Sequence, residues 1–261
     1  MNDEGMPVGR ELLDRIARHD LALSASVADV VEELDGATLV ADGRAPDLRE
    51  FNHAALIRSG SDEALQRLIT FFEKRKRQPA VVLDPDAPDG IAAKLSASGF
   101  KPVPSRSDLM LWNPDARHIY TAAEVYMTMA TNATLNEYLR IATLEMPEPA
   151  GEQARIMLTL QFRTQGFSFW FGLFNGTAAG VCPVFVRDEM AQVGPVVVSP
   201  EYRLKGVGLA LVNYLTRQSR KDGASVTYLF NDHNGPATGL CQTAGYQTVM
   251  EDARQVWVRE G

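Results

Sequence analysis

The sequence predicts an α/β protein made of two domains, and three observations support this fold class. Its 261 residues exceed what one ordinary hydrophobic core organises and are enough for two domains. Segments with the apolar pattern of strands alternate along the chain with segments of helical period. The last part of the chain also repeats the spacing of strand and helix landmarks found in the first half. We therefore expect one domain over residues 1–116 and a second over residues 117–261.

The first half contains alternating helices and strands joined by short connections. Ser61 is the expected capping residue of one helix, and Gly99 ends the next one. The basic run at 73–78 closes a helix, where cations favour the helix dipole and stay solvated. The turn composition of residues 113–118 places the domain boundary there. The expected elements are a helix over 11–34, strands over 37–43 and 50–57, a helix over 61–77, a strand over 79–84, a helix over 89–100 and a strand over 107–112.

The second half is expected to begin with a strand and two helices and to continue with a meander of strands. Asn175-Gly176 between two apolar runs is a strong hairpin signal. The run over 167–171 alternates between two faces, so its three phenylalanines share one face and Trp170 lies on the other. Core packing explains most of this cluster, with Trp170 also a candidate for a substrate pocket. The expected elements are a strand over 124–130, helices near 133–144 and 151–165, strands over 167–174, 178–186 and 192–198, and a helix after the loop that follows.

An internal repeat links the two halves at an offset of 146 residues. The identities are few, but strand and helix landmarks keep the same spacing, so we expect a repeated structural unit. The loop before the repeated helix differs, because the first half lacks a second glycine there. The pairs that keep the offset are AVVL (80–83) with VTYL (226–229), Gly99 with Gly245, Leu65 with Leu211, and Ile69 with Leu215.

The stretch "VVVSPEYRLKGVGLAL" at 196–211 joins a strand to a helix through two glycines. Backbone N–H groups at a helix N-terminus favour an anion, and Gly206 and Gly208 allow a ligand to approach the backbone closely. Arg203 and Lys205 add positive charge, so phosphate is the natural ligand. A Rossmann fingerprint would need a small residue where Leu211 stands, and a Walker loop is absent. The alternative is a plain strand–turn–helix junction that uses glycines for its turn.

The spacing Arg203-Leu-Lys-Gly206-Val-Gly208 resembles the pyrophosphate loop of the GNAT superfamily of N-acetyltransferases. The segment "NDHNGPATGLCQTAGYQTV" further along resembles the part of that superfamily that precedes a Gly-Phe landmark. Together these features cover roughly residues 122–258. The resemblance implies two GNAT-like acyl-CoA N-acyltransferase domains, each a mixed central sheet flanked by helices. The first, which lacks the loop, would be a degenerate copy.

The resemblance implies acetyl-CoA as co-substrate. It also implies a fourth strand that separates from the fifth and binds the pantetheine arm. The implied reaction is direct transfer of the acetyl group to the primary amine of a small molecule in a ternary complex. No covalent enzyme intermediate is needed, and strand N–H groups near Val197 and Val198 would serve the oxyanion. The implied coenzyme-binding residues are Val196, Val197, Val198, Arg203, Leu204, Lys205, Gly206, Val207, Gly208, Leu209 and Asn234.

The catalytic acid and base each have several candidates. Cys241 occupies the position where the family usually has a tyrosine that protonates the leaving thiolate, although a buried cysteine is most often a small apolar residue. Tyr246, Tyr228 or water are alternatives. Glu145 is the candidate base. Asp188, Glu189, Asp232 and His233 are further candidates for the base, with turns and caps as the plainer explanation for the acidic ones and a surface position for the histidine.

Several other classes of protein and site are disfavoured. The net charge of −7 argues against nucleic-acid binding, and no apolar run is long enough for a membrane helix. Two cysteines without a CxxC or Cys/His pairing favour neither a disulfide framework nor a metal site, and a reduced cytoplasm fits best. We expect a monomer or homodimer whose first half supports the second and shapes one wall of the acceptor cleft. Asn52 and His53 are candidates for a contact with the acceptor, with packing and capping as the plainer explanation. A non-catalytic acyl-CoA-binding module is the alternative function, and a structural protein without a CoA site is a third.

Overall fold

The computed structural model describes residues 8–34, 36–84, 87–116 and 124–259. The chain forms two compact units, which are not two consecutive segments. The N-terminal unit comprises Pro7–Asp108 together with Glu251–Gly261, and the C-terminal unit contains Leu109–Met250. The predicted boundary between residues 116 and 117 adjoins residues 117–123, which lie outside the described residues, so it remains a prediction.

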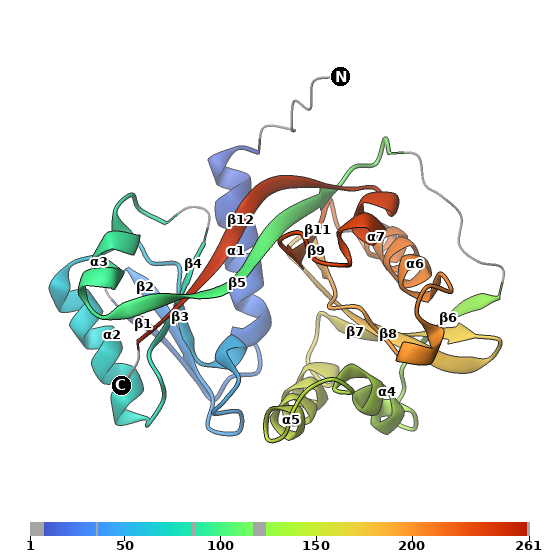
Figure 1. Cartoon of the computed structure of the whole chain (residues 1–261), viewed down its shortest axis with the longest axis horizontal. Helices are drawn as coiled ribbons and strands as arrows, with labels where there is room; N and C mark the ends of the chain where they lie inside the picture. The colour runs from blue at the N-terminus through green and yellow to red at the C-terminus, as the bar shows by residue number, and fades with distance from the viewer. Residues whose placement is uncertain (1–7, 35, 85–86, 117–123, 260–261) are drawn as a thin grey trace. The chain divides into compact units, whose positions relative to one another are not determined.

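The N-terminal unit is a mixed sheet with helices on both faces. Strands β1, β2 and β3 pair antiparallel in chain order, and β3 then pairs parallel with β4. Apolar side chains of α2 and α3 pack on one face of this sheet, and those of α1 pack on the other (Figure 1). The elements are α1 (Arg10–Ala25), β1 (Val30–Leu34), β2 (Ala37–Ala41), the 3₁₀ turn η1 (Arg49–Phe51), β3 (His53–Ala55), α2 (Asp62–Lys74), β4 (Ala80–Leu83), α3 (Ile91–Ala97) and β5 (Phe100–Trp112).

Three predicted elements of this unit were wrong in their extent, one of them the strand expected over 107–112, which begins at Phe100 as β5. The helix expected over 11–34 ends at Ala25, and Val30–Leu34 forms β1. This strand pairs with β2 along its whole length, and the Thr38 hydroxyl donates a hydrogen bond to Glu33. The strand expected over 50–57 begins only at His53, because the preceding residues form η1. In contrast, Ser61 caps α2 as predicted by accepting a hydrogen bond from the Ala64 N–H.

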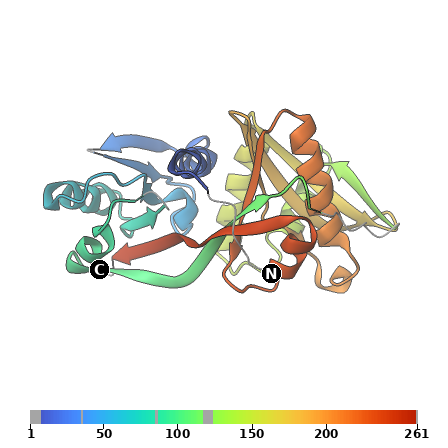
Figure 2. The ribbon, with the colours of Figure 1, turned by 90° about the horizontal axis from the view of Figure 1, so that it is seen from above.

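The C-terminal unit also has a mixed sheet, with strand order β11-β9-β8-β7-β6. Helix α6 packs on one face with Trp170, and α4 and α5 pack on the opposite face with Phe169 and Phe171 (Figures 1 and 2). The predicted alternation of residues 167–171 is therefore confirmed. The elements are β6 (Val125–Met129), α4 (Leu135–Ala142), α5 (Ala150–Phe162), β7 (Phe167–Phe174), β8 (Thr177–Arg187), β9 (Met190–Val193), β10 (Val197–Val198), η2 (Pro200–Tyr202), α6 (Val207–Lys221), β11 (Val226–Asp232), α7 (Thr238–Thr243) and β12 (Tyr246–Arg259).

Strands β5 and β12 each contribute residues to both units. Strand β5 begins in the N-terminal unit, and its last residues lie beside β11, where Met110 packs in the core of the C-terminal unit. Strand β12 begins in the C-terminal unit, and its residues 255–258 pair antiparallel with β4, where Trp257 packs in the core of the N-terminal unit. The final strand of each half therefore completes the sheet of the other unit.

The internal repeat predicted from the sequence is confirmed. Helix α2, strand β4 and helix α3 correspond in order to α6, β11 and α7. Leu65 and Leu211, which match at the offset of 146 residues, are both buried, as are Ile69 and Leu215. Strands β3 and β4, on either side of α2, pair parallel, and β9, the strand before the short β10, pairs parallel with β11 on the other side of α6.

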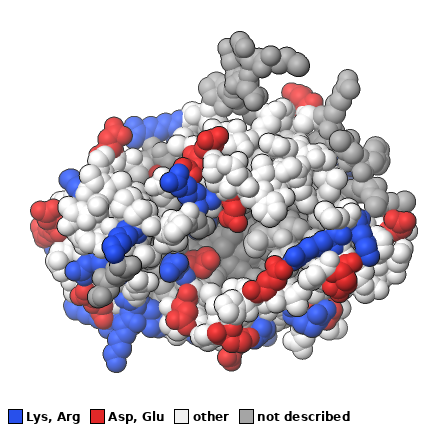
Figure 3. Space-filling view, viewed as in Figure 1, with Lys and Arg blue, Asp and Glu red and all other residues white. Residues whose placement is uncertain are grey.

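Charged side chains of both signs are interspersed on the face shown in Figure 3. The basic run at 73–78 ends α2 as expected, and the Arg75 guanidinium stacks over the Phe71 ring at 3.7 Å from its centroid. Among the described residues, no helix combines the length and apolar character that crossing a membrane requires.

Candidate functional site

The candidate site lies where two strands of the C-terminal unit separate. Strand β9 pairs parallel with β11 from Met190 to Gln192, opposite Val226 to Tyr228. The chain then passes Gly194, which has φ of 111°, and Pro195, and β10 pairs with β8 instead of β11. The strand predicted over 192–198 is therefore broken, and among the described strands none is next to β10 on the edge that faces away from β8. Such an edge offers backbone groups to an extended ligand.

The loop after β10 leads directly into α6. The buried Ser199 anchors it by donating its backbone N–H to the carbonyl of Ala179 at 2.9 Å. One turn of 3₁₀ helix follows, and Leu204 then adopts a φ of 60° with its side chain fully exposed. A non-glycine residue at positive φ is uncommon and marks a backbone held by its surroundings. The loop therefore projects its tip into solvent from two fixed ends.

Gly206 is the N-cap of α6, with φ of 80°. Because glycine has no side chain, it cannot accept hydrogen bonds from the first N–H groups of the helix, which have no partners within the helix. The positive end of the dipole of this 15-residue helix is thus free of a side-chain cap. This arrangement suits an anion at residues 206–209.

Three glycines allow close packing around the start of α6, Gly208 against α7 and the other two between the sheet, β10 and α6. A Cβ atom at Gly208 would lie 2.9 Å from Leu240 Cδ1, and one at Gly172 would lie 3.0 Å from Val207 Cγ1. A Cβ atom at Gly180 would lie only 2.9 Å from the carbonyl oxygen of Val197. Of these three glycines, only Gly208 was predicted from the sequence to allow a close approach. Gly172 and Gly180 both lie inside predicted strands. Glycine inside a strand commonly marks a close approach of backbone, so this position was the signal that could have identified them.

The two cations of the loop both contact other side chains. Arg203 forms an ion pair with Glu145, and its Nε also donates to the carbonyl of Val198 at 3.2 Å. Lys205 Nζ lies over the rings of Phe174 and Tyr202, 5.3 Å from each centroid. The structure thus brings Glu145, the candidate base, into contact with the loop that precedes α6.

Cys241 is buried in an apolar cluster with Met110, Val212, Leu229 and Tyr246. Burial raises the pKa of its thiol to about 11. The thiol is therefore protonated at neutral pH, and its surroundings agree with a packing role.

The tyrosines considered as alternatives to Cys241 are both buried. The Tyr246 hydroxyl shares a hydrogen bond of 2.6 Å with Thr216, and burial raises its pKa. The Tyr228 hydroxyl donates to Gln192 Oε1 at 3.1 Å. These two residues form the last pair before β9 and β11 separate, so Tyr228 is the tyrosine nearer to the separation.

The remaining polar candidates lie in turns. Asp188 and Glu189 form the β8–β9 turn, both at positive φ, and the Glu189 carbonyl accepts from the Ser225 N–H at 2.7 Å. Asp232 ends β11, and its carbonyl accepts from the Gly235 N–H at 2.8 Å. Asn234 is exposed in the same turn, with φ of 53°, and His233 is partly exposed beside it.

Asn231 was missed by the sequence analysis. It is buried, and its Nδ2 donates to the Thr238 hydroxyl at 2.8 Å and to the Asp232 carbonyl at 3.0 Å. These bonds fix the start of α7 against the end of β11. An asparagine at a strand end was the only signal available for it.

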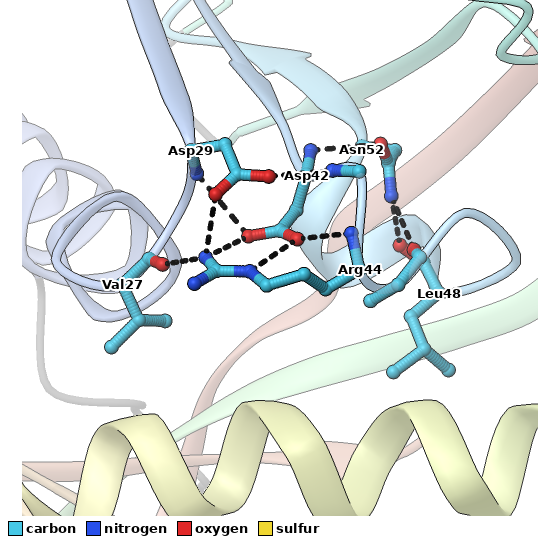
Figure 4. A network of polar contacts seen from close by, with 8 residues as sticks. Val27, Asp29, Asp42, Arg44, Leu48 and Asn52 are labelled. Atoms are coloured by element: carbon cyan, nitrogen blue, oxygen red, sulfur yellow. Dashed lines mark hydrogen bonds and ion pairs between the residues drawn. The ribbon is translucent and has the colours of Figure 1, made fainter.

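Asn52 belongs to a polar network in the N-terminal unit (Figure 4), and His53 follows it as the first residue of β3. Asn52 accepts from the Asp42 N–H and donates to the carbonyls of Ala45 and Leu48. His53 Nδ1 lies 3.0 Å from the Arg49 carbonyl. Both side chains are buried and their contacts are structural, as predicted.

Trp170 likewise has a packing role. It is buried under α6, where its ring lies 5.3 Å from that of Tyr214, and its Nε1 donates to the Ser168 hydroxyl.

Comparison with known proteins supports the arrangement described above. Residues 135–246 match the model of the acetyltransferase (GNAT) family. None of the curated proteins matches the sequence. A GCN5-related N-acetyltransferase from Kribbella flavida is similar in structure, with 17% identity, a TM-score of 0.73 and 96% of each chain covered.

Two other solved structures are also similar along most of the chain. A putative GNAT acetyltransferase from Novosphingobium aromaticivorans has 15% identity and a TM-score of 0.61, with 94% of this chain and 97% of that chain covered. A tandem GNAT protein from the clavulanic acid biosynthesis pathway has 16% identity and a TM-score of 0.55, with 98% of each chain covered. At these identities the likeness shows the fold, which is that of GNAT proteins, including a tandem one. The protein therefore carries a domain of the GNAT acetyltransferase family at residues 135–246.

Proposed function

We propose that the protein is an acetyl-CoA-dependent N-acetyltransferase that acts on the primary amine of a small molecule. The observation that carries this proposal is the separation of β10 from β11 directly before the uncapped, glycine-started helix α6. A free strand edge suits the amide-containing pantetheine arm, and a helix N-terminus suits the pyrophosphate. The strand edge and the helix N-terminus are separated by one loop. One extended ligand with an anionic end can therefore contact both.

In this proposal the coenzyme lies along Val196, Val197 and Val198 with its pyrophosphate at residues 203–209. Asn234, exposed at the end of β11, would contact the coenzyme arm. The amine lone pair attacks the thioester carbonyl carbon, the C–N bond forms and the C–S bond breaks. Backbone N–H groups near Val197 and Val198 stabilise the oxyanion, which is the kind of contact that lowers such a barrier most.

Two protons must move during this reaction. The amine loses one to a base, for which Glu145 is the proposed residue. The departing thiolate gains one from an acid, for which Cys241 is the proposed residue, because it stands at the position of the family's tyrosine and its thiol carries a proton at neutral pH. The Tyr228 hydroxyl, close to the separation of the strands, is the alternative acid. Positioning of the two substrates supplies much of the remaining rate enhancement.

The N-terminal unit is proposed to be a degenerate copy of the same fold. The repeated order of α2, β4 and α3 supports this proposal. The Ser61 side chain caps the N-terminus of α2. The proposed anion site lies at the N-terminus of α6, which has no side-chain cap, so the corresponding helix end of the N-terminal unit is already occupied by a hydroxyl group.

A substitution at Leu204 tests the coenzyme site without disturbing the core. Its side chain is fully exposed at the loop tip, so Leu204→Glu adds a negative charge there and Leu204→Gln serves as the neutral control of the same shape. Repulsion of about 1–2 kcal/mol from the pyrophosphate should weaken acetyl-CoA binding about 5- to 30-fold in Leu204→Glu. Isothermal titration calorimetry of acetyl-CoA with the two variants and the unaltered protein measures this difference.

Turnover provides the second part of the test. The thiol of released CoA can be followed with a thiol reagent while a panel of primary amines is supplied, because both cysteines of the protein are buried. Equal affinities in the two Leu204 variants would contradict the proposed coenzyme site. Tight binding without CoA release from any amine would contradict the proposed activity.

A further inference from the structure

The ion pair between Glu145 and Arg203 connects two distant parts of the C-terminal unit. Arg203 stands in the proposed pyrophosphate loop, and Glu145 lies 58 residues earlier, in the connection between α4 and α5. The Arg203 guanidinium also donates through Nε to the carbonyl of Val198, the last residue of β10. One side chain thus contacts a carboxylate and the proposed pantetheine strand at once.

The loop has two cations, Arg203 and Lys205. In the described part of the chain, Arg203 is the one that forms an ion pair with a carboxylate. Lys205 instead lies over the faces of two aromatic rings, which leave its charge unneutralised. A guanidinium is also the group best suited to bind a phosphate with two parallel hydrogen bonds. Glu145 therefore pairs with the loop cation that is best suited to bind a phosphate.

We infer that Glu145 competes with the coenzyme pyrophosphate for Arg203 and so weakens coenzyme binding. This inference rests on the proposed function. The pair is accessible enough to exchange, since the Arg203 and Glu145 side chains are 48% and 62% exposed. A phosphate that takes over the guanidinium must break this pair, and the displaced carboxylate then lies near the incoming negative charge. Both effects oppose binding.

The contact with Val198 adds a second consequence. When Arg203 turns toward a pyrophosphate, its Nε leaves the Val198 carbonyl, and this acceptor at the end of β10 becomes available to an amide of the pantetheine arm. Binding of the anionic end of the coenzyme thereby opens a hydrogen-bonding position for its extended arm. Glu145 acts through Arg203 and is in this role a positioning residue.

The test compares Glu145→Gln with the control Glu152→Gln, which removes the same charge from an exposed position on α5. An exposed ion pair contributes little, so Glu145→Gln should bind acetyl-CoA about 1.5- to 5-fold more tightly, and Glu152→Gln should bind like the unaltered protein. The gain should shrink at 0.5 M salt, where screening weakens the pair. Calorimetry at about 50 mM and at high salt measures both effects.

Two further comparisons connect the effect to Arg203 and to the phosphates. In an Arg203→Gln background, Glu145→Gln should no longer improve binding, as a double-mutant cycle would show. Acetyl-pantetheine lacks the pyrophosphate, so its affinity should be the same for Glu145→Gln and for the unaltered protein. A merely structural role of Glu145 would alter binding of both ligands alike.

Unchanged or weaker acetyl-CoA binding by Glu145→Gln would overturn the inference while leaving the proposed function in place. The same holds if the gain persists without Arg203 or extends to acetyl-pantetheine. If the unaltered protein and Glu145→Gln both fail to bind acetyl-CoA, the proposed function is contradicted and the inference falls with it.

Discussion

Gly180→Ala should disrupt the placement of β10 and α6 with the smallest possible change. Gly180 pairs with Val198 in the β8–β10 register. An added Cβ atom would lie 2.9 Å from the Val197 carbonyl oxygen, 3.1 Å from Val207 Cγ1 and 3.2 Å from Val198 Cγ2. The first of these atoms is backbone and cannot rotate away, so β10 itself must move outward from β8.

The expected cost is that of overpacking a tight site, about 1–3 kcal/mol in the free energy of unfolding. For a chain of this size, each kcal/mol corresponds to about 2–4 °C, so the melting temperature should fall by about 2–12 °C. Because the added methyl group displaces the strand that the coenzyme is proposed to pair with, acetyl-CoA affinity should fall as well. Differential scanning calorimetry and acetyl-CoA titration measure the two effects on the same preparation.

Gly239→Ala is the matched control. No atom lies within 4 Å of the added Cβ position, and Gly239 is inside α7 without a positive φ. Alanine should therefore stabilise this helix by about 0.5–1 kcal/mol. The reasoning is refuted if Gly180→Ala matches the unaltered protein in melting temperature and in acetyl-CoA affinity, because the close approach at Gly180 would then not be required.

Three further predictions concern titratable groups. Burial and the charge of Arg254 lower the pKa of His53 to about 4, so the unfolded chain binds more protons than the folded one between about pH 4 and 6.5. The free energy of unfolding should therefore fall by up to about 3 kcal/mol as the pH drops through this window, and be independent of His53 above it. Urea unfolding between pH 4 and 8 should show a shallower slope in His53→Gln, and equal slopes would contradict the assignment. Burial also raises the pKa of Cys241 to about 11, so at pH 8 its alkylation by iodoacetamide should be at least about 200-fold slower in the folded protein than in urea. If Cys241 donates the proton to the leaving thiolate, Cys241→Ala should lower kcat without changing acetyl-CoA affinity, and an unaltered kcat would favour Tyr228 or water.

Elements whose pattern is local were predictable from the sequence. Helix α2 carries its own cap at Ser61, and the turn at Asn175-Gly176 fixes the hairpin of β7 and β8. Strand β1 was not predictable, because residues 26–34 contain no glycine or proline to interrupt a helical pattern. Its strand conformation comes from hydrogen bonds to β2, which a local pattern does not reveal.

The loop residues of the candidate site could be found from glycine spacing, and the structure adds what spacing cannot show. The break of the strand at Gly194-Pro195 depends on the change of partner from β11 to β8. The ion pair of Glu145 with Arg203 joins residues that only the folded chain brings together. Strand partners and ion pairs depend on which residues lie close together in space. A single sequence does not contain this information in its local pattern, so these contacts could not be predicted.

The passage of β12 into the N-terminal unit has a consequence for synthesis of the chain. The Gln78 side chain, just before β4, donates to the carbonyl of Arg259, which is made 181 residues later. At about 5–20 residues per second, a ribosome needs roughly 10–40 seconds to cover that stretch. During this interval the apolar strand Ala80–Leu83 has its partner on one side only, and an unpaired apolar edge is a template for aggregation. We therefore expect this edge to stay unpaired for longer during synthesis than it would if each unit were one continuous segment of the chain.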